Sequence, residues 1–288
     1  GILSTSSIAP RFISGVREWG KGSIVALSSR STEKAREKAE QWDIPVFYSS
    51  HEELLRDERV NIVYISNVNT QHYPWAKAAL LAGKHVICEK PCTTTYAHTK
   101  ELYELARKQG LFFMEAQKML FFPAVLAAKE HLPQLGKITM AEMSHSFPGS
   151  YNGWMFDPEA GGGPLLSSGI YALQLMLWLF GGIAQIGGTA DLLEGGVEWQ
   201  YILTGKTESG VLFTAKNSTR SVLDNTCRIF GERGFLELPN YWKAQKVILH
   251  IDGVTETLEF PCVHELCYEA AHIADCLEKG LCASPVIT

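Results

Sequence analysis

The residues with the clearest chemical potential are Glu89 and Lys90, which lie between the apolar run His85–Cys88 and Pro91. That run has the length and composition of a buried strand, and parallel sheets bind ligands at the carboxyl ends of their strands. An ammonium group there can hydrogen-bond a substrate hydroxyl and favour the anionic form of a nearby phenol or alkoxide, which eases proton transfer. The alternative is a solvated Glu-Lys pair on the surface.

A second polar cluster, Ser28-Ser29-Arg30, follows the strand-like run Ile24–Leu27. An NAD-specific fold places an Asp or Glu here for the ribose 2′-hydroxyl, and this cluster has no acid. Ser29 and Arg30 suit a 2′-phosphate instead, because a guanidinium makes bidentate, charge-assisted bonds and stacks on adenine. Arg30 taken alone is equally compatible with a solvated charge before the next helix. The cluster therefore favours NADP(H) over NAD(H) only if a nucleotide-binding fold surrounds it.

The segment Gly1–Ala9 stands where such a fold has its phosphate-binding turn between a strand and a helix. Glycine is expected at positions 4 and 6, because a tight turn against pyrophosphate leaves no room for Cβ, and both residues are serine. A helix N-terminus still binds a diphosphate through its free N–H groups and its dipole. The predicted cofactor-binding residues of this turn are Ser4, Thr5, Ser6, Ser7 and Ile8, with a plain helix cap as the alternative.

The elements that must position these residues alternate along the first half of the chain. Strand-like runs are Gly1–Leu3, Ile24–Leu27, Ile62–Ile65, His85–Cys88 and Leu111–Met114, and helix-like segments are Ser31–Trp42, Ser50–Arg56, His72–Ala82 and Tyr96–Gln109. Ser50 and Glu53 fit a capping box. Parallel strands joined by helices imply right-handed crossovers. We therefore predict an α/β Rossmann domain with a doubly wound parallel sheet over residues 1–118.

The rhythm changes after Pro123, where a helix, a long strand-like run, a Gly/Pro-rich loop and an apolar helix around Tyr171–Phe180 follow one another. Short, turn-bounded strands then dominate, as an antiparallel sheet requires. The predicted strands are Ile138–Ser146, Gln200–Thr204, Gly210–Lys216, Thr226–Phe230, Val247–Ile251 and Thr255–Phe260. Residues 119–288 are predicted to form an α+β substrate-binding and oligomerisation domain with a mostly antiparallel, open sheet.

Composition narrows the possible partners. The 288 residues are 46% hydrophobic and carry a net charge of −5, with no concentration of Lys or Arg that would bind nucleic acid. The apolar runs are shorter than the roughly 20 residues of a membrane span, and the N-terminus lacks a signal pattern. Seven cysteines without a CxxC pair indicate reduced thiols, with no disulfide framework and no metal site. We expect a soluble, cytoplasmic protein.

At Glu89-Lys90-Pro91 the sequence resembles the Gfo/Idh/MocA family (glucose–fructose oxidoreductase and inositol dehydrogenase), whose hallmark is Glu-Lys-Pro at this location. The other similar segments are Asn67–His72, which resembles a Pro-Asn-x-x-His loop with Val68 in place of proline, Ala82–Val86, Glu115-Ala116 and Gly161–Leu166. Within the family, Leu165–Tyr171 and Ser284–Ile287 are most similar to dimeric dihydrodiol dehydrogenases and NADP-dependent D-xylose dehydrogenases. The resemblance implies that Asn67, Asn69, His72, Glu89 and Lys90 bind the cofactor.

The same resemblance implies a catalytic pair, in which Tyr171 exchanges the proton of the substrate hydroxyl while Lys90 holds that hydroxyl and lowers the phenol pKa from about 10. A core aromatic is the alternative for Tyr171. Ser167 stands where those enzymes carry an aspartate, so the orientation of the substrate is open. Lys90, Trp154, Ser167 and Tyr171 are the predicted substrate-binding residues, although a loop aromatic such as Trp154 can also pack between domains or subunits.

Together these features predict an NAD(P)-dependent dehydrogenase that transfers a hydride between NADP(H) and a hydroxyl or carbonyl carbon of a small sugar, polyol or cyclic diol. The alternative is a non-catalytic NADP-binding sensor on the same fold. The resemblance implies a homodimer or homotetramer that packs through the open sheet. It also implies further residues at both ends, because only three residues precede the phosphate turn and the family's final helix is missing.

Overall fold

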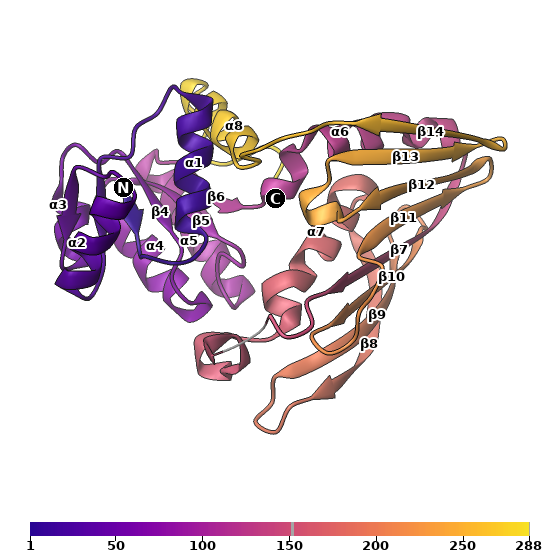
Figure 1. The fold of residues 1–288 in the computed structure, drawn as a ribbon, viewed down its shortest axis with the longest axis horizontal. Helices are drawn as coiled ribbons and strands as arrows, with labels where there is room; N and C mark the ends of the chain where they lie inside the picture. The colour runs from indigo at the N-terminus through magenta and orange to yellow at the C-terminus, as the bar shows by residue number, and fades with distance from the viewer. Residues whose placement is uncertain (151–152, 288) are drawn as a thin grey trace. The chain divides into compact units, whose positions relative to one another are not determined.

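A computed structural model describes residues 1–150 and 153–287. The chain forms two compact units, which are described separately. The first contains Gly1–Gln117 together with the C-terminal segment from His264, and the second contains Lys118–Val263 (Figure 1). The sequence predicted that residues 119–288 form one domain, whereas the segment from His264 groups with the first unit.

The first unit has a six-stranded, all-parallel sheet in the order β3-β2-β1-β4-β5-β6. The strands are β1 (Ile2–Leu3), β2 (Ala26–Ser28), β3 (Val46–Tyr48), β4 (Ile62–Ile65), β5 (His85–Glu89) and β6 (Phe113–Ala116). The order reverses between β1 and β4, so the doubly wound Rossmann prediction is confirmed and ligands are expected at that switch point. Edge strand β3 was not among the predicted runs, because three half-buried residues give too short a pattern.

The first unit has five helices before its C-terminal segment, three of which begin after a side-chain cap. They are α1 (Ala9–Trp19), α2 (Thr32–Gln41), α3 (His51–Arg56), α4 (His72–Leu81) and α5 (Tyr96–Gln109), with the 3₁₀ turn η1 (Asn69–Gln71) before α4. The side chains of Ser31, Ser50 and Thr95 accept hydrogen bonds from backbone N–H groups in the first turns of α2, α3 and α5. These caps place the helix N-termini at the loops that follow β2, β3 and β5.

The C-terminal segment belongs to the first unit because it packs on α1 and extends the edge beside β6. Helix α8 (Cys267–Glu278) lies against α1, and a Cβ at Gly15 would approach the backbone carbon of Leu266 to 2.6 Å (Figure 1). The Phe113 N–H donates to the Cys282 carbonyl at 3.0 Å. Hydrophobic periodicity along the sequence does not predict this packing, because the contacts join residues more than a hundred positions apart.

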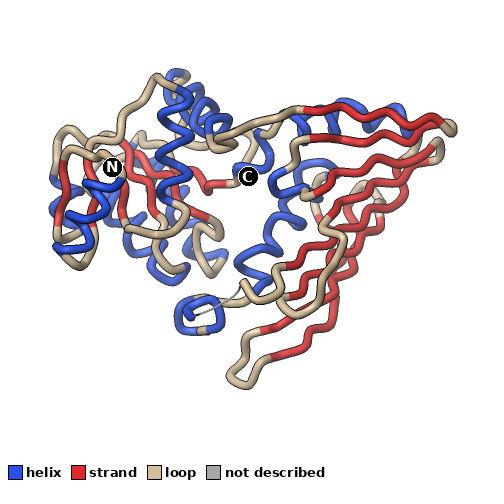
Figure 2. The backbone as a smooth tube through the Cα atoms, in the orientation of Figure 1, coloured by secondary structure: helices blue, strands red, loops and turns tan. Residues whose placement is uncertain are grey.

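The second unit contains an eight-stranded sheet, whose strands are drawn in red at the right of Figure 2. The strand order is β14-β13-β12-β11-β7-β10-β9-β8, and β7 and β10 are the one parallel pair among the described strands of this sheet. The strands are β7 (Ile138–Ser146), β8 (Ile183–Leu192), β9 (Glu198–Thr207), β10 (Leu212–Ser218), β11 (Thr226–Gly231), β12 (Gly234–Pro239), β13 (Lys246–Ile251) and β14 (Val254–Glu259). The prediction of a mostly antiparallel sheet is confirmed. Strands β8 and β12 were not predicted.

The two faces of this sheet differ in composition. One face buries apolar side chains such as Met143, Ile229 and Leu249 beneath α6 (Pro123–His131) and α7 (Ile170–Phe180). The short helical turns of this unit are η2 (Lys118–Phe121), η3 (Leu132–Leu135), η4 (Gly153–Phe156), η5 (Pro158–Ala160), the π-helical turn η6 (Leu165–Gly169) and η7 (Tyr241–Lys243). The opposite face is polar around Arg228 but also exposes Met140, Ile202 and Leu212, so it is open to solvent within the unit.

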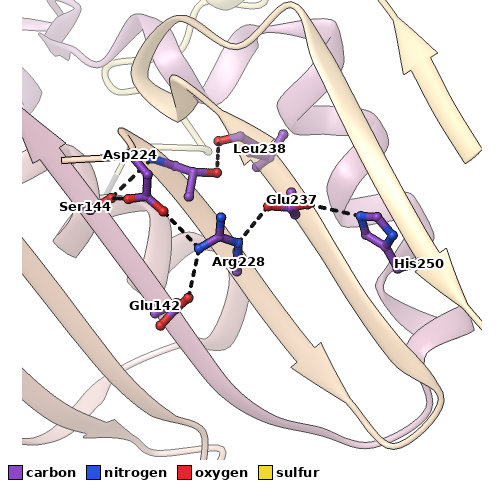
Figure 3. A network of polar contacts seen from close by, with 8 residues as sticks. Glu142, Ser144, Asp224, Arg228, Glu237, Leu238 and His250 are labelled. Atoms are coloured by element: carbon purple, nitrogen blue, oxygen red, sulfur yellow. Dashed lines mark hydrogen bonds and ion pairs between the residues drawn. The ribbon is translucent and has the colours of Figure 1, made fainter. Parts of the chain in front are cut away.

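A charge network links four strands on the polar face (Figure 3). The Arg228 guanidinium of β11 contacts Glu142 of β7 at 3.2 Å, Asp224 at 2.9 Å and Glu237 of β12 at 2.6 Å, and these carboxylates raise its pKa. Glu237 also contacts the imidazole of His250 at 3.0 Å. An arginine shared by three carboxylates ties adjacent strands through side chains as well as backbone hydrogen bonds.

Residues 158–180 form the one stretch of the described chain that is long and apolar enough to cross a membrane by length and composition. Half of an 18-residue window in that stretch is buried within the protein, and its α-helical part, α7, has 11 residues. Buried core helices share this length and composition with membrane spans.

Candidate active site

The predicted phosphate turn joins β1 to α1 at the switch point of the first sheet. Ser4 has a φ of +114°, in the region that favours glycine, so the serine adopts the backbone conformation expected of the residue it replaces. Its N–H donates to the Ser28 carbonyl of β2 at 3.2 Å. The Ser6 hydroxyl donates to the Ser66 hydroxyl after β4 at 2.7 Å. The turn is therefore fastened to both neighbouring strands.

The start of α1 fits a diphosphate. Within residues 1–150 and 153–287, the backbone N–H groups of Thr5, Ser7 and Ile8 have no hydrogen-bond acceptor, and no side chain caps this helix. Unpaired N–H groups at the positive end of a helix dipole form an anion-binding site. Ser7 is exposed, whereas Thr5, Ser6 and Ile8 are partly buried. All five residues predicted for this turn lie at the start of α1.

Replacing Ser4 with glycine is expected to stabilise the protein, because a serine Cβ at this φ costs of the order of 1–3 kcal/mol that glycine avoids. The gain is reduced by the greater backbone entropy of glycine in the unfolded chain, so about 1 kcal/mol should remain. Thermal and urea unfolding measure it, with Ser7→Gly, at an exposed position without positive φ, as the matched control. Equal destabilisation by both substitutions would contradict the assignment of strain to Ser4.

A chain of polar groups crosses the ends of β2 and β4. The Ser28 hydroxyl contacts His51 Nδ1 at 2.8 Å, and His51 Nε2 lies 3.5 Å from Asn67 Nδ2. Burial lowers the pKa of His51 to about 4, so the imidazole is neutral at pH 7. The Asn67 Oδ1 atom is buried and accepts no hydrogen bond from the described part of the chain. Sequence reasoning missed His51, since a first-turn histidine carries no signal of the strand end that it meets.

Ser29 and Arg30 lie beside this chain of polar groups. Ser29 is buried and its hydroxyl accepts from the Ser31 N–H at 3.5 Å, while Arg30 is exposed. The charge of Arg30 acts on His51 and contributes to the lowering of its pKa, after the larger effect of burial. The exposed guanidinium is therefore at the β2 end of the switch-point edge, where the 2′ position of a bound nucleotide is expected.

His72 fastens the loop after β4 to the loop after β5. Its Nδ1 lies 2.7 Å from the Pro91 carbonyl and its Nε2 lies 2.9 Å from the Asn67 carbonyl. The ring is 1% exposed, and burial lowers its pKa. Both ring nitrogens thus face backbone oxygens, which gives His72 a supporting role here. Asn69 is buried at the start of η1, within the loop after β4.

The Glu89 carboxylate supports Lys90. Glu89 Oε1 accepts from the Tyr64 hydroxyl at 2.6 Å, and Oε2 accepts from the Lys90 backbone N–H at 3.2 Å. The Tyr64 ring stacks on Phe12 of α1 with 3.8 Å between centroids. Glu89 is therefore engaged by the protein, and its predicted contact with the cofactor stays a prediction.

Lys90 lies at the carboxyl end of β5, as predicted, beside two acids. Burial lowers the pKa of Lys90, and the charges of Glu89 and Glu115 oppose that shift. Glu115 of β6 accepts from the Cys92 N–H at 2.8 Å and from the Gln117 amide at 3.0 Å, and burial raises its pKa. An amine with a lowered pKa beside carboxylates can hold a hydroxyl and take part in proton transfer nearer to neutral pH.

The second unit holds Tyr171, Ser167 and Trp154. The π-helical turn η6 leads directly into α7, and such turns often occur at functional sites. The Leu165 N–H at its start donates to the Glu198 carboxylate of β9 at 2.5 Å, which places a negative charge at a helix N-terminus. Tyr171 in the first turn of α7 is 8% exposed.

Ser167 and Trp154 are the other two substrate-binding residues predicted for the second unit. The Ser167 N–H donates to the Gly163 carbonyl at 3.0 Å within η6, and the residue is half-buried. Trp154 in η4 is 37% exposed. Within the part of the chain that the structure describes, no group of three or more His, Cys, Asp or Glu side chains is arranged to hold a metal ion.

Known proteins match this chain over its whole length. Residues 2–117 match the family described as "Oxidoreductase family, NAD-binding Rossmann fold", and residues 127–237 match the GFO/IDH/MocA C-terminal domain. The trans-1,2-dihydrobenzene-1,2-diol dehydrogenase of Mus musculus is 33% identical over 304 residues, covering 100% of this chain and 90% of the mouse protein. The Bos taurus enzyme of the same name is 34% identical over 310 residues, with the same coverage.

Solved structures share the fold. The aldose-aldose oxidoreductase of Caulobacter crescentus in complex with glycerol has a TM-score of 0.90 at 24% identity, covering 99% of this chain and 90% of that one. Levoglucosan dehydrogenase in complex with NADH and levoglucosan has a TM-score of 0.89 at 17% identity, covering 99% and 91%. With the switch-point site and the full-length similarity to dehydrogenases, these findings show that the chain belongs to the Gfo/Idh/MocA family of NAD(P)-binding oxidoreductases.

Proposed function

We propose that the protein oxidises a small vicinal diol or sugar with NADP⁺, or reduces the corresponding carbonyl with NADPH. The observation that carries the proposal is the position of Lys90 directly after β5, at the ligand-binding edge of the Rossmann sheet, where burial lowers its pKa and the charges of Glu89 and Glu115 oppose that shift. The relatives named for trans-1,2-dihydrobenzene-1,2-diol support a diol, and the structures with levoglucosan and glycerol support a sugar or polyol.

In this proposal the nicotinamide, when bound, supplies or accepts the hydride. The N–H groups of Thr5, Ser7 and Ile8 hold the diphosphate, and Ser29 and Arg30 hold the adenosine end. Lys90 donates a hydrogen bond to the substrate hydroxyl, and Tyr171 exchanges the proton of that hydroxyl. Nicotinamide absorbance tests turnover of trans-1,2-dihydrobenzene-1,2-diol, D-xylose and levoglucosan. Tight NADPH binding without turnover of any sugar or diol would favour a nucleotide sensor instead.

The preference for NADPH is proposed from Arg30, since the 2′-phosphate is the only group that distinguishes NADPH from NADH. Arg30→Ala is expected to weaken NADPH binding about 10- to 100-fold, because a hydrogen bond between charged groups contributes about 1.5–3 kcal/mol, and to leave NADH binding unchanged. Fluorescence titration measures both constants. Arg36→Ala, which removes an α2 arginine over the Phe47 ring, is the matched control. Equal affinities of the wild type for both nucleotides would contradict this assignment.

We also propose that two or more copies associate through the uncovered sheet face of the second unit. Met140, Ile202 and Leu212 lie on that face and are 46%, 47% and 50% exposed, close to the Arg228 network. Ile202→Asp is expected to shift the protein towards monomer in light scattering coupled to gel filtration, because an interface core excludes an unpaired charge. Val254→Asp, at an exposed β14 position, is the control. A wild type that is monomeric at all concentrations would contradict the proposal.

A further inference from the structure

A row of polar side chains crosses the buried face of the second sheet. Asn217 of β10 is the register partner of His145 in β7 and of Tyr201 in β9, so the three side chains lie next to one another on one face. They are 2%, 1% and 5% exposed, respectively. Two residues earlier along β10 and β7, the same face carries Ala215 and Met143. Polar groups in such a place are retained where hydrogen bonds or a ligand compensate for their burial.

The carboxamide of Asn217 is fixed in one orientation. Its Nδ2 donates to the Ser168 hydroxyl at 2.6 Å, and that hydroxyl in turn donates to the Pro164 carbonyl at 3.1 Å. Because Ser168 uses its single hydrogen for Pro164, Asn217 must present its NH₂ group to Ser168. The Oδ1 atom then points elsewhere, and it is buried without a hydrogen-bond partner among the described residues. A buried acceptor left in this state costs about 1–3 kcal/mol.

Two observations place this amide near Tyr171. Ser168, which holds the amide, lies in the π-helical turn η6 and precedes Tyr171 of α7 by three residues. His145, which adjoins Asn217 in the sheet, lies 6.3 Å from Tyr171 between ring centroids. The amide and the phenol thus share one neighbourhood within the second unit.

We infer that Asn217 Oδ1 accepts a hydrogen bond from the substrate hydroxyl next to the one that reacts, which makes Asn217 a specificity residue for vicinal diols. The inference rests on the proposed function, in which Tyr171 serves the reacting hydroxyl. A neutral amide oxygen accepts from a hydroxyl without exchanging a proton, so it orients the substrate and leaves the acid–base chemistry to other groups. A site built to bind a hydroxyl discriminates strongly against an analogue that lacks it, because the buried group is then unpaired.

The test compares trans-cyclohexane-1,2-diol with cyclohexanol as substrates of the full chain with NADP⁺. Asn217→Leu is expected to lower kcat/KM for the diol about 10- to 100-fold, mainly through KM, and to change kcat/KM for cyclohexanol little. Asn217→Asp, which retains an acceptor oxygen, should recover most of the preference for the diol. Ser168→Ala removes the partner of Nδ2 but leaves Oδ1, so it should reduce the preference less than Asn217→Leu does.

The outcomes separate this inference from the proposed function. An unchanged diol preference in Asn217→Leu, or equal losses on both substrates, would overturn the inference and leave the amide a structural group. A wild type that oxidises sugars but does not favour the diol over cyclohexanol would also overturn it, without affecting the proposed dehydrogenase activity. The proposed function itself fails if the wild type binds no nucleotide. Should Asn217→Leu not fold, Asn217→Ala, which is smaller and has no side-chain acceptor, decides in the same way.

Discussion

Replacing Lys90 with methionine is expected to lower kcat/KM about 10²- to 10⁴-fold, the range that positioned proton-transfer groups contribute. Methionine is similar in length to lysine but has no ammonium group, so the Glu89 and Glu115 carboxylates lose the charge that they adjoin. NADPH affinity should fall far less than kcat/KM, because the phosphate turn and Arg30 remain. Steady-state kinetics and fluorescence titration measure the two effects.

The pH dependence of the Lys90 variant sharpens this prediction. Burial lowers the pKa of Lys90, so the wild type should lose activity as pH rises through a value below the ordinary 10.4 of lysine. The unfolded chain binds its Lys90 proton up to higher pH than the folded chain does. The stability of the wild type relative to Lys90→Met should therefore increase with pH between the lowered pKa and about 10.4.

The exposed Lys100, which pairs with Glu104 on α5, provides the control for these measurements. Lys100→Met should leave both the kinetics and the alkaline limb unchanged. A Lys90→Met protein that keeps wild-type kcat/KM would show that Lys90 takes no part in the reaction. It would support the alternative in which Glu89 and Lys90 are a solvated pair.

Replacing Tyr171 with phenylalanine is expected to lower kcat about 10²- to 10⁴-fold with little change in KM, since only the phenolic hydroxyl is lost. The aromatic ring remains beside His145, so thermal stability should be close to that of the wild type. Single-turnover kinetics with NADPH and a carbonyl substrate isolate the chemical step from product release.

Tyr241 is the matched control for Tyr171, because it is buried in the same unit and its ring lies 6.0 Å from the same histidine. Burial raises the pKa of Tyr241 well above its ordinary value, so this phenol releases its proton poorly. Tyr241→Phe should retain most of the activity. Equal losses in the two variants would indicate that a packing change, rather than a missing proton, lowers the rate.

Local chemistry made much of the first unit predictable. Short hydrophobic runs predicted the bounds of β4 and β5 to within one residue. The hydroxyls of Ser31, Ser50 and Thr95 cap α2, α3 and α5, as expected of residue types that favour helix N-caps. Once parallel strands alternate with helices, handedness and the switch point follow, and they bring Ser4, Asn67 and Lys90 to one edge.

Other features depend on partners that are distant in sequence. Strand β8 is exposed along nearly all of its length, so no alternation of apolar residues marks it, and its pairing with β9 alone defines it. The return of α8 to α1 depends on the absence of a side chain at Gly15. A single glycine of this kind does not change the hydrophobic periodicity from which helices are predicted.

By itself, the sequence determined the doubly wound parallel fold, the family and the residues at the strand ends, because these depend on local patterns and short motifs. Only the tertiary structure decided how those residues are supported. It showed the strained φ of Ser4, the two backbone oxygens that face His72, the acids whose charges act on Lys90, and the buried Asn217 amide near Tyr171. These properties arise from burial and from contacts across dozens of positions, which no local pattern encodes.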